Sequence, residues 1–329
     1  MIYKITGAVQ KKFYWEDGNS EEPVRRYEKN PIIRRNDFKP GSRVFNSGVA
    51  AFGGKFVGVF RCEGGDGLPQ LYCGWSDNAV DWKIAKEKIE FVGENGEKFQ
   101  PYYSYDPRLV EIEGVYYIIW CTDIGGCPTL GIAITTDFNK FVRMPHGFLP
   151  FNRNGVLFPE KIDGKFMMLS RPSDNGHTPF GDIYISESPD LRYWGNHKLL
   201  MKKTINGEWW ESVKIGAGPA PIKTNAGWIL FYHGVTGTCN GFVYSMGAAL
   251  LDLKDPSKVV ARSDKYLLTP ETPYETTGFV PNVIFPCGAL CDGEGRITLF
   301  YGAADTCLAV AFTTADAVIK FIKENNGLK

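Results

Sequence analysis

Gly54-KFVGVF-Arg61 is a turn glycine followed by a mainly apolar run, and the same pattern occurs four more times along the chain. An apolar run of this length after a turn glycine predicts a strand that is buried on both faces. The copies recur at intervals of 50 to 68 residues, which indicates an internal structural repeat. The other four are Gly114-VYYIIW-Cys121, Gly164-KFMMLS-Arg171, Gly227-WILFYH-Gly234 and Gly295-RITLFY-Gly302.

Each copy has a further strand-like run on either side. The run before it ends in a polar, Gly-containing turn, as in 106–114, and the run after it ends in an aspartate turn, as in 184–194. Short strands joined by such turns predict antiparallel units. Five units of three to four strands predict an all-β fold, a single-domain five-bladed β-propeller. The alternative is a β-sandwich with accidental similarity between segments, and five copies in chain order favour the propeller.

The segments outside the repeat are expected to be accessory. Residues 1–40 form a predicted N-terminal arm, rich in charges and proline, that wraps the outside or makes a contact in a homo-oligomer. Residues 315–329 are predicted to contain a short amphipathic C-terminal helix. The whole chain, 1–329, is therefore expected to be one catalytic domain.

Composition excludes several classes of protein. The 329 residues carry 37 Lys+Arg and 37 Asp+Glu, so neither a nucleic acid nor a membrane is expected as partner. Aromatic residues reach 14%, with 37 Gly and 20 Pro, which is typical of an all-β protein. The chain shows no leader pattern and no long apolar window, so a cytoplasmic location is expected. The eight cysteines form no CxxC pair and are expected to be free, buried thiols, with no metal and no organic cofactor.

Polar residues stand at equivalent positions of the repeats. In a propeller the inner strands line a central channel, so residues near their ends become neighbours in space. The predicted inner strands begin near Asn46, Asp106, Arg153, Lys214 and Asn282, and the second strands end near Arg61, Asp123, Arg171, His233 and Asp305. One pocket is therefore expected to gather carboxylates and cations, which are rarely buried without partners.

Each of these residues also has a structural alternative. Asp106 precedes a proline, and such a pair often starts a turn. Arg61 and Arg171 are equally compatible with salt bridges between blades, and His233 with a core histidine that has its hydrogen-bond partners.

The chain resembles the β-mannoside phosphorylases of glycoside hydrolase family 130. The similar motifs run in family order from about residue 30 to residue 315, and they are RVFNSGV (43–49), YDPR (105–108), PFNRNGVLFP (150–159), SRPSDNGHTPFGDI (170–183), KIGAGPAPI (214–222), YHGV (232–235), YSMGAALLDLKDPSKV (244–259), FVPNVIFPCGAL (279–290) and YGAADT (301–306). The resemblance is strongest to the subgroup acting on β-1,4-mannooligosaccharides and on β-1,4-mannosyl-N-acetylglucosamine.

This resemblance implies a five-bladed propeller and a reversible, inverting phosphorolysis. A terminal β-mannosyl unit of an oligosaccharide passes to inorganic phosphate and gives α-mannose 1-phosphate. Asp106 matches the family's catalytic acid, whose proton reaches the leaving oxygen through the mannosyl 3-hydroxyl. The other matching positions are Asn46, Ser47, Arg61 and Asp305 for the mannosyl ring; Arg153, Arg171, Lys214, His233 and Tyr244 for phosphate; and, less strongly, Tyr105, Asp123, His177 and Phe285 for the acceptor sugar.

Two other functions stay open on this sequence. Family members that lack the phosphate-binding cations hydrolyse their substrate, and a hydrolase needs a base carboxylate opposite Asp106, for which Glu63 or Asp123 are candidates. A propeller that binds carbohydrate without catalysis is the third possibility, and it leaves the cluster of cations unexplained.

Overall fold

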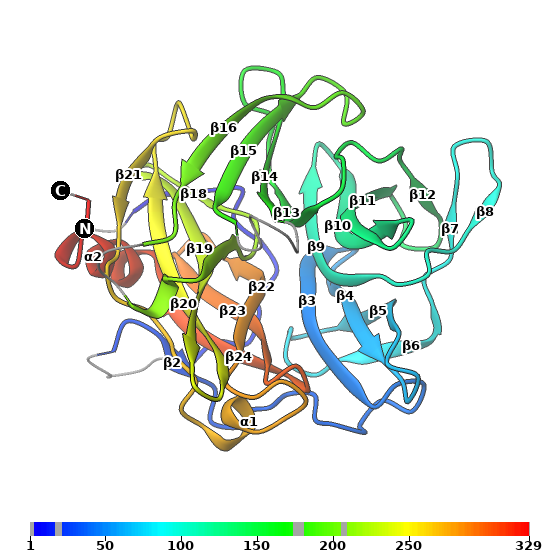
Figure 1. The fold of residues 1–329 in the computed structure, drawn as a ribbon, viewed down its shortest axis with the longest axis horizontal. Coiled ribbons are helices and arrows are strands. Elements are labelled where there is room, and N and C mark those ends of the chain that lie inside the picture. The colour runs from blue at the N-terminus through cyan, green and yellow to red at the C-terminus, as the bar shows by residue number, and fades with distance from the viewer. Residues whose placement is uncertain (1–2, 17–21, 174–180, 205–208, 329) are drawn as a thin grey trace.

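The fold is built from five sheets arranged around a common centre, and their strands pair antiparallel except for one short parallel pair in the second sheet (Figure 1). The computed structural model describes residues 3–16, 22–173, 181–204 and 209–328. The predicted five-bladed β-propeller is confirmed. Each turn glycine and apolar run of the repeat forms the second strand of a blade, paired on both sides as predicted.

We number the blades in chain order. Blade 1 contains β3 (Arg43–Phe52), β4 (Lys55–Glu63), β5 (Pro69–Ser76) and β6 (Lys83–Lys88). Blade 2 contains β9 (Tyr105–Ile112), β10 (Val115–Ile124), β11 (Cys127–Thr135) and β12 (Phe141–Arg143), extended outward by β7 (Phe91–Val92) and β8 (Lys98–Phe99). Blade 3 contains β13 (Asn152–Leu157), β14 (Phe166–Pro172), β15 (Ile183–Ser188) and β16 (Gly195–Met201).

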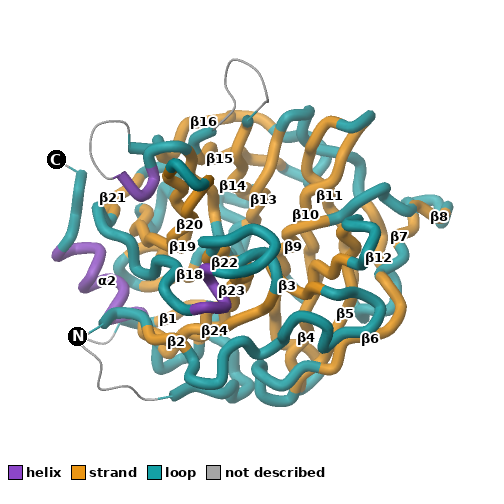
Figure 2. The backbone as a smooth tube through the Cα atoms, turned by 60° about the horizontal axis from the view of Figure 1, so that its bottom comes forward, coloured by secondary structure: helices purple, strands orange, loops and turns teal. Residues whose placement is uncertain are grey.

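Blades 4 and 5 complete the ring. In blade 4, β17 (Lys214–Ala217) and β18 (Ile222–Thr224) both pair with β19 (Gly227–Thr238), which is followed by β20 (Gly241–Leu251) and β21 (Val259–Arg262). Blade 5 contains β22 (Ile284–Cys291), β23 (Arg296–Ala303) and β24 (Cys307–Thr314). Its fourth strand, β2 (Arg25–Arg26), comes from the N-terminal segment, and β1 (Ile5–Thr6) pairs with β18 (Figure 2).

Part of the predicted N-terminal arm therefore belongs to the propeller itself. Strand β2 pairs with the outer edge of β24. Main-chain N–H and C=O groups of β24 that would lack partners at a sheet edge therefore form hydrogen bonds. After β24 the chain forms α2 (Ala315–Glu324), the short C-terminal helix that the sequence predicts. The remaining helical turns are η1 (Trp209–Glu211) and α1 (Pro273–Thr276), and none of the helices in the described ranges is long and apolar enough to cross a membrane.

The second strand of each blade is apolar on both faces because each face packs on a different neighbour. In β4, Phe56 and Phe60 pack toward blade 5, whereas Val57 and Val59 pack toward blade 2. Successive side chains of a strand point to opposite faces, so one continuous apolar run serves two cores. The same alternation occurs in β19 and leaves an apolar cluster between each pair of neighbouring blades.

Polar turns after the third strands repeat a hydrogen-bond pattern. In blade 3, Asp190 Oδ1 accepts from the backbone N–H groups of Arg192 and Tyr193, and Asp137 plays the same part in blade 2. In blade 1 the role falls to Asn78 rather than Asp77, because it lies two residues after the hydroxyl of Ser76. Of the eight free cysteines six are buried as expected, whereas Cys239 is exposed and Cys127 is partly exposed.

Ring closure generates a stability prediction at Glu275 in α1. This fully buried carboxylate accepts from Arg26 Nε at 2.8 Å and from the Tyr301 hydroxyl at 2.9 Å, and so ties β2 to blade 5. Glu275→Ala is expected to lower the free energy of unfolding by about 3–5 kcal/mol, because it leaves a partly buried guanidinium without its main partner. Urea denaturation followed by tryptophan fluorescence measures the change.

Glu271→Ala is the matched control for this prediction. Glu271 also pairs with Arg26, at 3.2 Å, but its side chain is 63% exposed. Its loss is expected to cost at most about 1 kcal/mol. Equal losses for the two variants would contradict the role assigned to Glu275.

Candidate active site

Three blades place an Asn or Asp at the same point of the innermost strand. Asn46, Asp106 and Asn154 each lie in an irregularity of the strand register, and each has a positive φ, of 49°, 51° and 53°. Asn and Asp tolerate this left-handed conformation better than other residues that have a Cβ atom. A bulge of this kind re-aims a side chain, and here all three residues line one cavity.

Gly302 of β23 is required for the approach of Asn46. A Cβ atom on Gly302 would lie 1.8 Å from Asn46 Oδ1, so any larger residue displaces the amide. Asn46 Nδ2 donates to Asp106 Oδ1 at 2.8 Å. Blade 5 therefore helps to position a contact between blades 1 and 2.

Asp106 is held from blade 1. Arg61 Nη1 donates to Asp106 Oδ1 at 2.7 Å, the same oxygen that accepts from Asn46, and Oδ2 accepts no hydrogen bond from the described residues. Arg61 is held in turn by Glu63, a carboxylate only 3% exposed that also accepts from Arg43. Burial opposes the charge on Arg61, but Asp106, Asp305 and Glu63 together raise its pKa.

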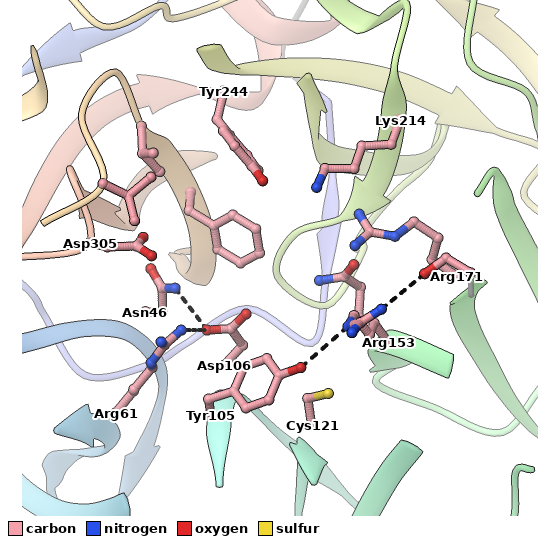
Figure 3. Close-up of a pocket in the computed structure, with 15 residues that line it drawn as sticks. Asn46, Arg61, Tyr105, Asp106, Cys121, Arg153, Arg171, Lys214, Tyr244 and Asp305 are labelled. Atoms are coloured by element: carbon pink, nitrogen blue, oxygen red, sulfur yellow. Dashed lines mark hydrogen bonds and ion pairs between the residues drawn. The ribbon is translucent and has the colours of Figure 1, made fainter. Parts of the chain in front are cut away.

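Asp305 is the second carboxylate that lines the cavity. Figure 3 shows it beside Asn46, on the same side as Asp106 and Arg61. Burial raises the pKa of Asp305 to about 6, with Arg61 opposing this shift and Asp106 adding to it. The two carboxylates therefore lie on one side of the cavity and share one guanidinium.

The opposite side of the cavity carries cations from blades 3 and 4 (Figure 3). Arg153 donates from Nε to the Tyr105 hydroxyl and from Nη1 to Ser173, both at 3.3 Å. Arg171 Nη1 donates to His233 Nε2 at 3.1 Å. Neither arginine forms a salt bridge with a carboxylate of the described residues, so this side of the cavity is poor in compensating charge.

Burial dominates the electrostatics of this side. Burial, together with the neighbouring guanidinium groups of Arg171 and Arg153, lowers the pKa of Lys214 to about 7, and burial lowers that of Arg171 to about 10. Burial, with Arg171, Arg108 and Lys214 nearby, also holds the pKa of His233 well below its ordinary value. His233 is therefore neutral and accepts the hydrogen bond from Arg171. A bound anion would reverse these shifts.

The cavity has a volume of about 370 Å³, enough for a hexose and a small anion. Most residues predicted from the sequence line it: Asn46, Arg61, Tyr105, Asp106, Arg153, Arg171, Lys214, Tyr244, Phe285 and Asp305. Ser47 and His233 are fully buried beside it, and Asp123 lies outside the lining, where it accepts from the N–H of Gly126. His177 falls outside the described residues.

Five further residues line the cavity and were not expected to form the site: Cys121, Asn154, Ser173, Val280 and Val283. The repeat contained a signal for two of them. Asn154 is the counterpart of Asp106, and Cys121 is the counterpart of Arg61 and Arg171 at the end of the second strand. Val280 and Val283 belong to the connection before β22, which no repeat pattern describes.

Arg108 does not line the cavity but holds the backbone near it. It is 2% exposed and donates to the carbonyl oxygens of Asp106, Ala217 and Gly218. The bonds to Ala217 and Gly218 join blade 2 to blade 4. The bond to the carbonyl of Asp106 fixes the backbone of Asp106 itself.

Comparison with known proteins agrees with this geometry. A family model described as β-1,4-mannooligosaccharide phosphorylase, that of glycoside hydrolase family 130, matches residues 20–324. The chain belongs to glycoside hydrolase family 130. It is 46% identical to the β-1,4-mannooligosaccharide phosphorylase of Ruminococcus albus, over 98% of both chains.

Other members of family 130 align along most of the chain. The 4-O-β-D-mannosyl-D-glucose phosphorylase of Bacteroides fragilis is 28% identical over 97% of this chain and 83% of its own. The solved β-1,2-mannobiose phosphorylase of Listeria innocua superposes with a TM-score of 0.81 at 26% identity, over 92% of this chain and 99% of its own. The family thus includes phosphorylases with different linkages and different acceptor sugars.

The lowered pKa of Lys214 generates a prediction about stability and pH. Below pH 7 the native protein must bury a charged amine, whereas the unfolded chain keeps this proton up to its ordinary pKa of 10.5. Lys214→Met is therefore expected to raise the free energy of unfolding most below pH 7, and the gain shrinks as the pH rises from about 7 toward 10.5. Urea denaturation in phosphate-free buffer at pH 6 and pH 9 measures it.

Lys86→Met, at an exposed position of β6, is the control. It is expected to change stability by the same small amount at both pH values. A gain from Lys214→Met that is as large at pH 9 as at pH 6 would disprove the assigned electrostatics.

Proposed function

We propose that this chain is an inverting phosphorylase that transfers the terminal β-1,4-linked mannosyl unit of a mannooligosaccharide, or of mannosyl-N-acetylglucosamine, to inorganic phosphate. The observation that carries the proposal is the division of one cavity into a carboxylate side and a cationic side. The R. albus relative, 46% identical over almost the whole chain, supports the β-1,4 linkage and the oligosaccharide class.

The cationic side has the chemistry of a phosphate site. Guanidinium groups recognise oxyanions through paired N–H donors, and an ammonium group adds a point charge. Arg153, Arg171 and Lys214 supply these groups, and Tyr244 adds a hydroxyl directed into the cavity (Figure 3). His233 acts indirectly, as the acceptor that orients Arg171.

The carboxylate side has the chemistry of an acid-assisted sugar site. Phosphate attacks the anomeric carbon, the bond to the leaving oxygen breaks, and that oxygen takes a proton that originates at Asp106. By the family resemblance the proton passes through the mannosyl 3-hydroxyl. Asn46, Arg61 and Asp305 surround Asp106 and are proposed to hold the mannosyl hydroxyls. Binding both reactants in one cavity replaces a bimolecular encounter by a positioned one.

The alternative of a hydrolase needs a base carboxylate facing Asp106 across the sugar, roughly 6.5–9.5 Å away. Glu63 is occupied by Arg43 and Arg61, and Asp123 does not line the cavity. The described residues that line the cationic side include no carboxylate. These observations favour phosphate over water as nucleophile. The cytoplasmic location and the contact between copies of the chain stay predictions.

Phosphate dependence is the test of this function. The protein is incubated with β-1,4-mannobiose or mannosyl-N-acetylglucosamine, with and without inorganic phosphate. Mannose 1-phosphate is expected only when phosphate is present, and Asp106→Asn is expected to reduce its release by about 10²–10⁴-fold. Free mannose released without phosphate would establish the hydrolase, and binding without turnover would establish a non-catalytic propeller.

The phosphate pocket is tested separately by steady-state kinetics. Arg171→Ala and Lys214→Ala are each expected to raise KM for phosphate at least about tenfold, because each removes a charged contact to the nucleophile. Lys165→Ala, at the far end of the β14 hairpin, is the control and is expected to change KM less than about twofold. Unchanged phosphate dependence in both cationic variants would defeat the assignment of this pocket.

A further inference from the structure

A row of tyrosine rings leads from the cavity to the protein surface. Tyr105 lines the cavity, the ring of Tyr103 lies 5.6 Å from that of Tyr105, and the ring of Tyr102 lies 6.1 Å from that of Tyr103. Tyr102 ends the row with 69% of its surface exposed. A large aromatic ring left in solvent next to a ligand cavity points to a contact made by the ligand.

The backbone that carries these rings is fixed by blade 1. Gln70 Nε2 donates to the carbonyl of Tyr102 at 3.2 Å, and the N–H of Ser104 donates to the carbonyl of Pro69 at 2.9 Å. Blade 2 adds a hydrogen bond of 3.2 Å from Thr122 Oγ1 to the carbonyl of Tyr103. The rings are therefore presented on a segment anchored to both blades, which limits the ordering needed when a ligand binds.

The row begins next to Asp106, the proposed proton donor to the leaving oxygen, and the Tyr105 hydroxyl also accepts from Arg153 at 3.3 Å. In an inverting displacement the nucleophile and the leaving group occupy opposite faces of the anomeric carbon. In the proposed phosphate site Arg153 and Arg171 belong to blade 3 and Lys214 and Tyr244 to blade 4, whereas the tyrosine row belongs to the junction of blades 1 and 2, next to Asp106. In Figure 1 the segment from β8 to β9 returns to the centre along that junction.

Polar groups accompany the rings, as a carbohydrate site requires. The carboxylate of Asp123, at the end of β10, lies near Tyr103, and the amide of Gln100 lies next to that of Gln70, at 2.9 Å. A sugar ring presents an apolar C–H face and a rim of hydroxyls. An aromatic plane with nearby carboxylate and amide groups matches both parts.

We propose that Tyr102 and Tyr103 form a distal subsite for the third and later sugar units of a β-1,4-linked mannose chain. A disaccharide fills only the mannosyl position and the position next to Tyr105, and a longer chain extends along the row toward Tyr102. The enzyme is thereby adapted to oligosaccharides over disaccharides. This inference rests on the proposed function, because the proposed positions of phosphate and of Asp106 decide which way the sugar chain runs through the cavity.

The test compares chain lengths at saturating inorganic phosphate. The kcat/KM values for β-1,4-mannotetraose and β-1,4-mannobiose are measured for wild type, Tyr102→Ala and Tyr102→Phe. Tyr102→Ala is expected to lower the ratio of tetraose to biose about three- to tenfold, the range for loss of one aromatic contact. Tyr102→Phe keeps the ring face and is expected to lower the ratio less.

Tyr193→Ala is the matched control, because Tyr193 is an equally exposed tyrosine, 75%, in the turn between β15 and β16 of blade 3. It is expected to leave the ratio at the wild-type value. An unchanged ratio in Tyr102→Ala, or an equal loss on both substrates, would overturn the subsite.

Failure of the proposed function is recognised separately. In that case wild type releases no mannose 1-phosphate from either substrate. Calorimetric titration of mannotetraose into wild type and Tyr102→Ala then decides the subsite: weaker binding by the variant supports it, and equal binding overturns it.

Discussion

The buried cations of blades 3 and 4 set the main physical constraint on this protein. Arg171 is 6% exposed and Arg153 is partly buried, and the described residues offer neither of them a carboxylate. Removing such charges from water is costly when no carboxylate compensates them, and burial beside the two guanidinium groups likewise lowers the pKa of Lys214. An anion that enters the cavity would lower this cost, which is the physical reason for proposing phosphate on this side.

The carboxylate side follows a different rule, because its charges are balanced internally. Glu63 accepts hydrogen bonds from both Arg43 and Arg61, and Arg61 also presents one N–H group to a single oxygen of Asp106. The other oxygen of Asp106 accepts no hydrogen bond from the described residues. A bulge in the inner strands of blades 1 and 2 makes this arrangement possible, since it turns the side chains of Asn46 and Asp106 out of the pleat and toward the channel.

The repeat explains why the site could be assembled from distant residues, and also where that reasoning stops. In blades 1 to 3 the positions seven residues after the turn glycine became neighbours, so Arg61 and Arg171 were predictable and Cys121 followed the same rule. Asn154 follows a second rule, the bulge position of the inner strand that it shares with Asn46 and Asp106. Val280 and Val283 could not be found in this way, because they lie in a connection outside the repeat. Asp123 also shows the limit: it ends a second strand, yet its carboxylate turns to a backbone N–H group beside the cavity.

The sequence alone determined the blades. A strand buried between two neighbouring blades must be apolar on both faces, and every copy of the repeat contains such an apolar run. It also determined which residue types meet near the channel. Only the tertiary structure decided that β2 closes blade 5, since two residues carry no strand pattern of their own and gain their partners from β24. Only the tertiary structure, likewise, separated carboxylates from cations, because the direction of each side chain depends on strand register and on bulges that arise when the strands pair.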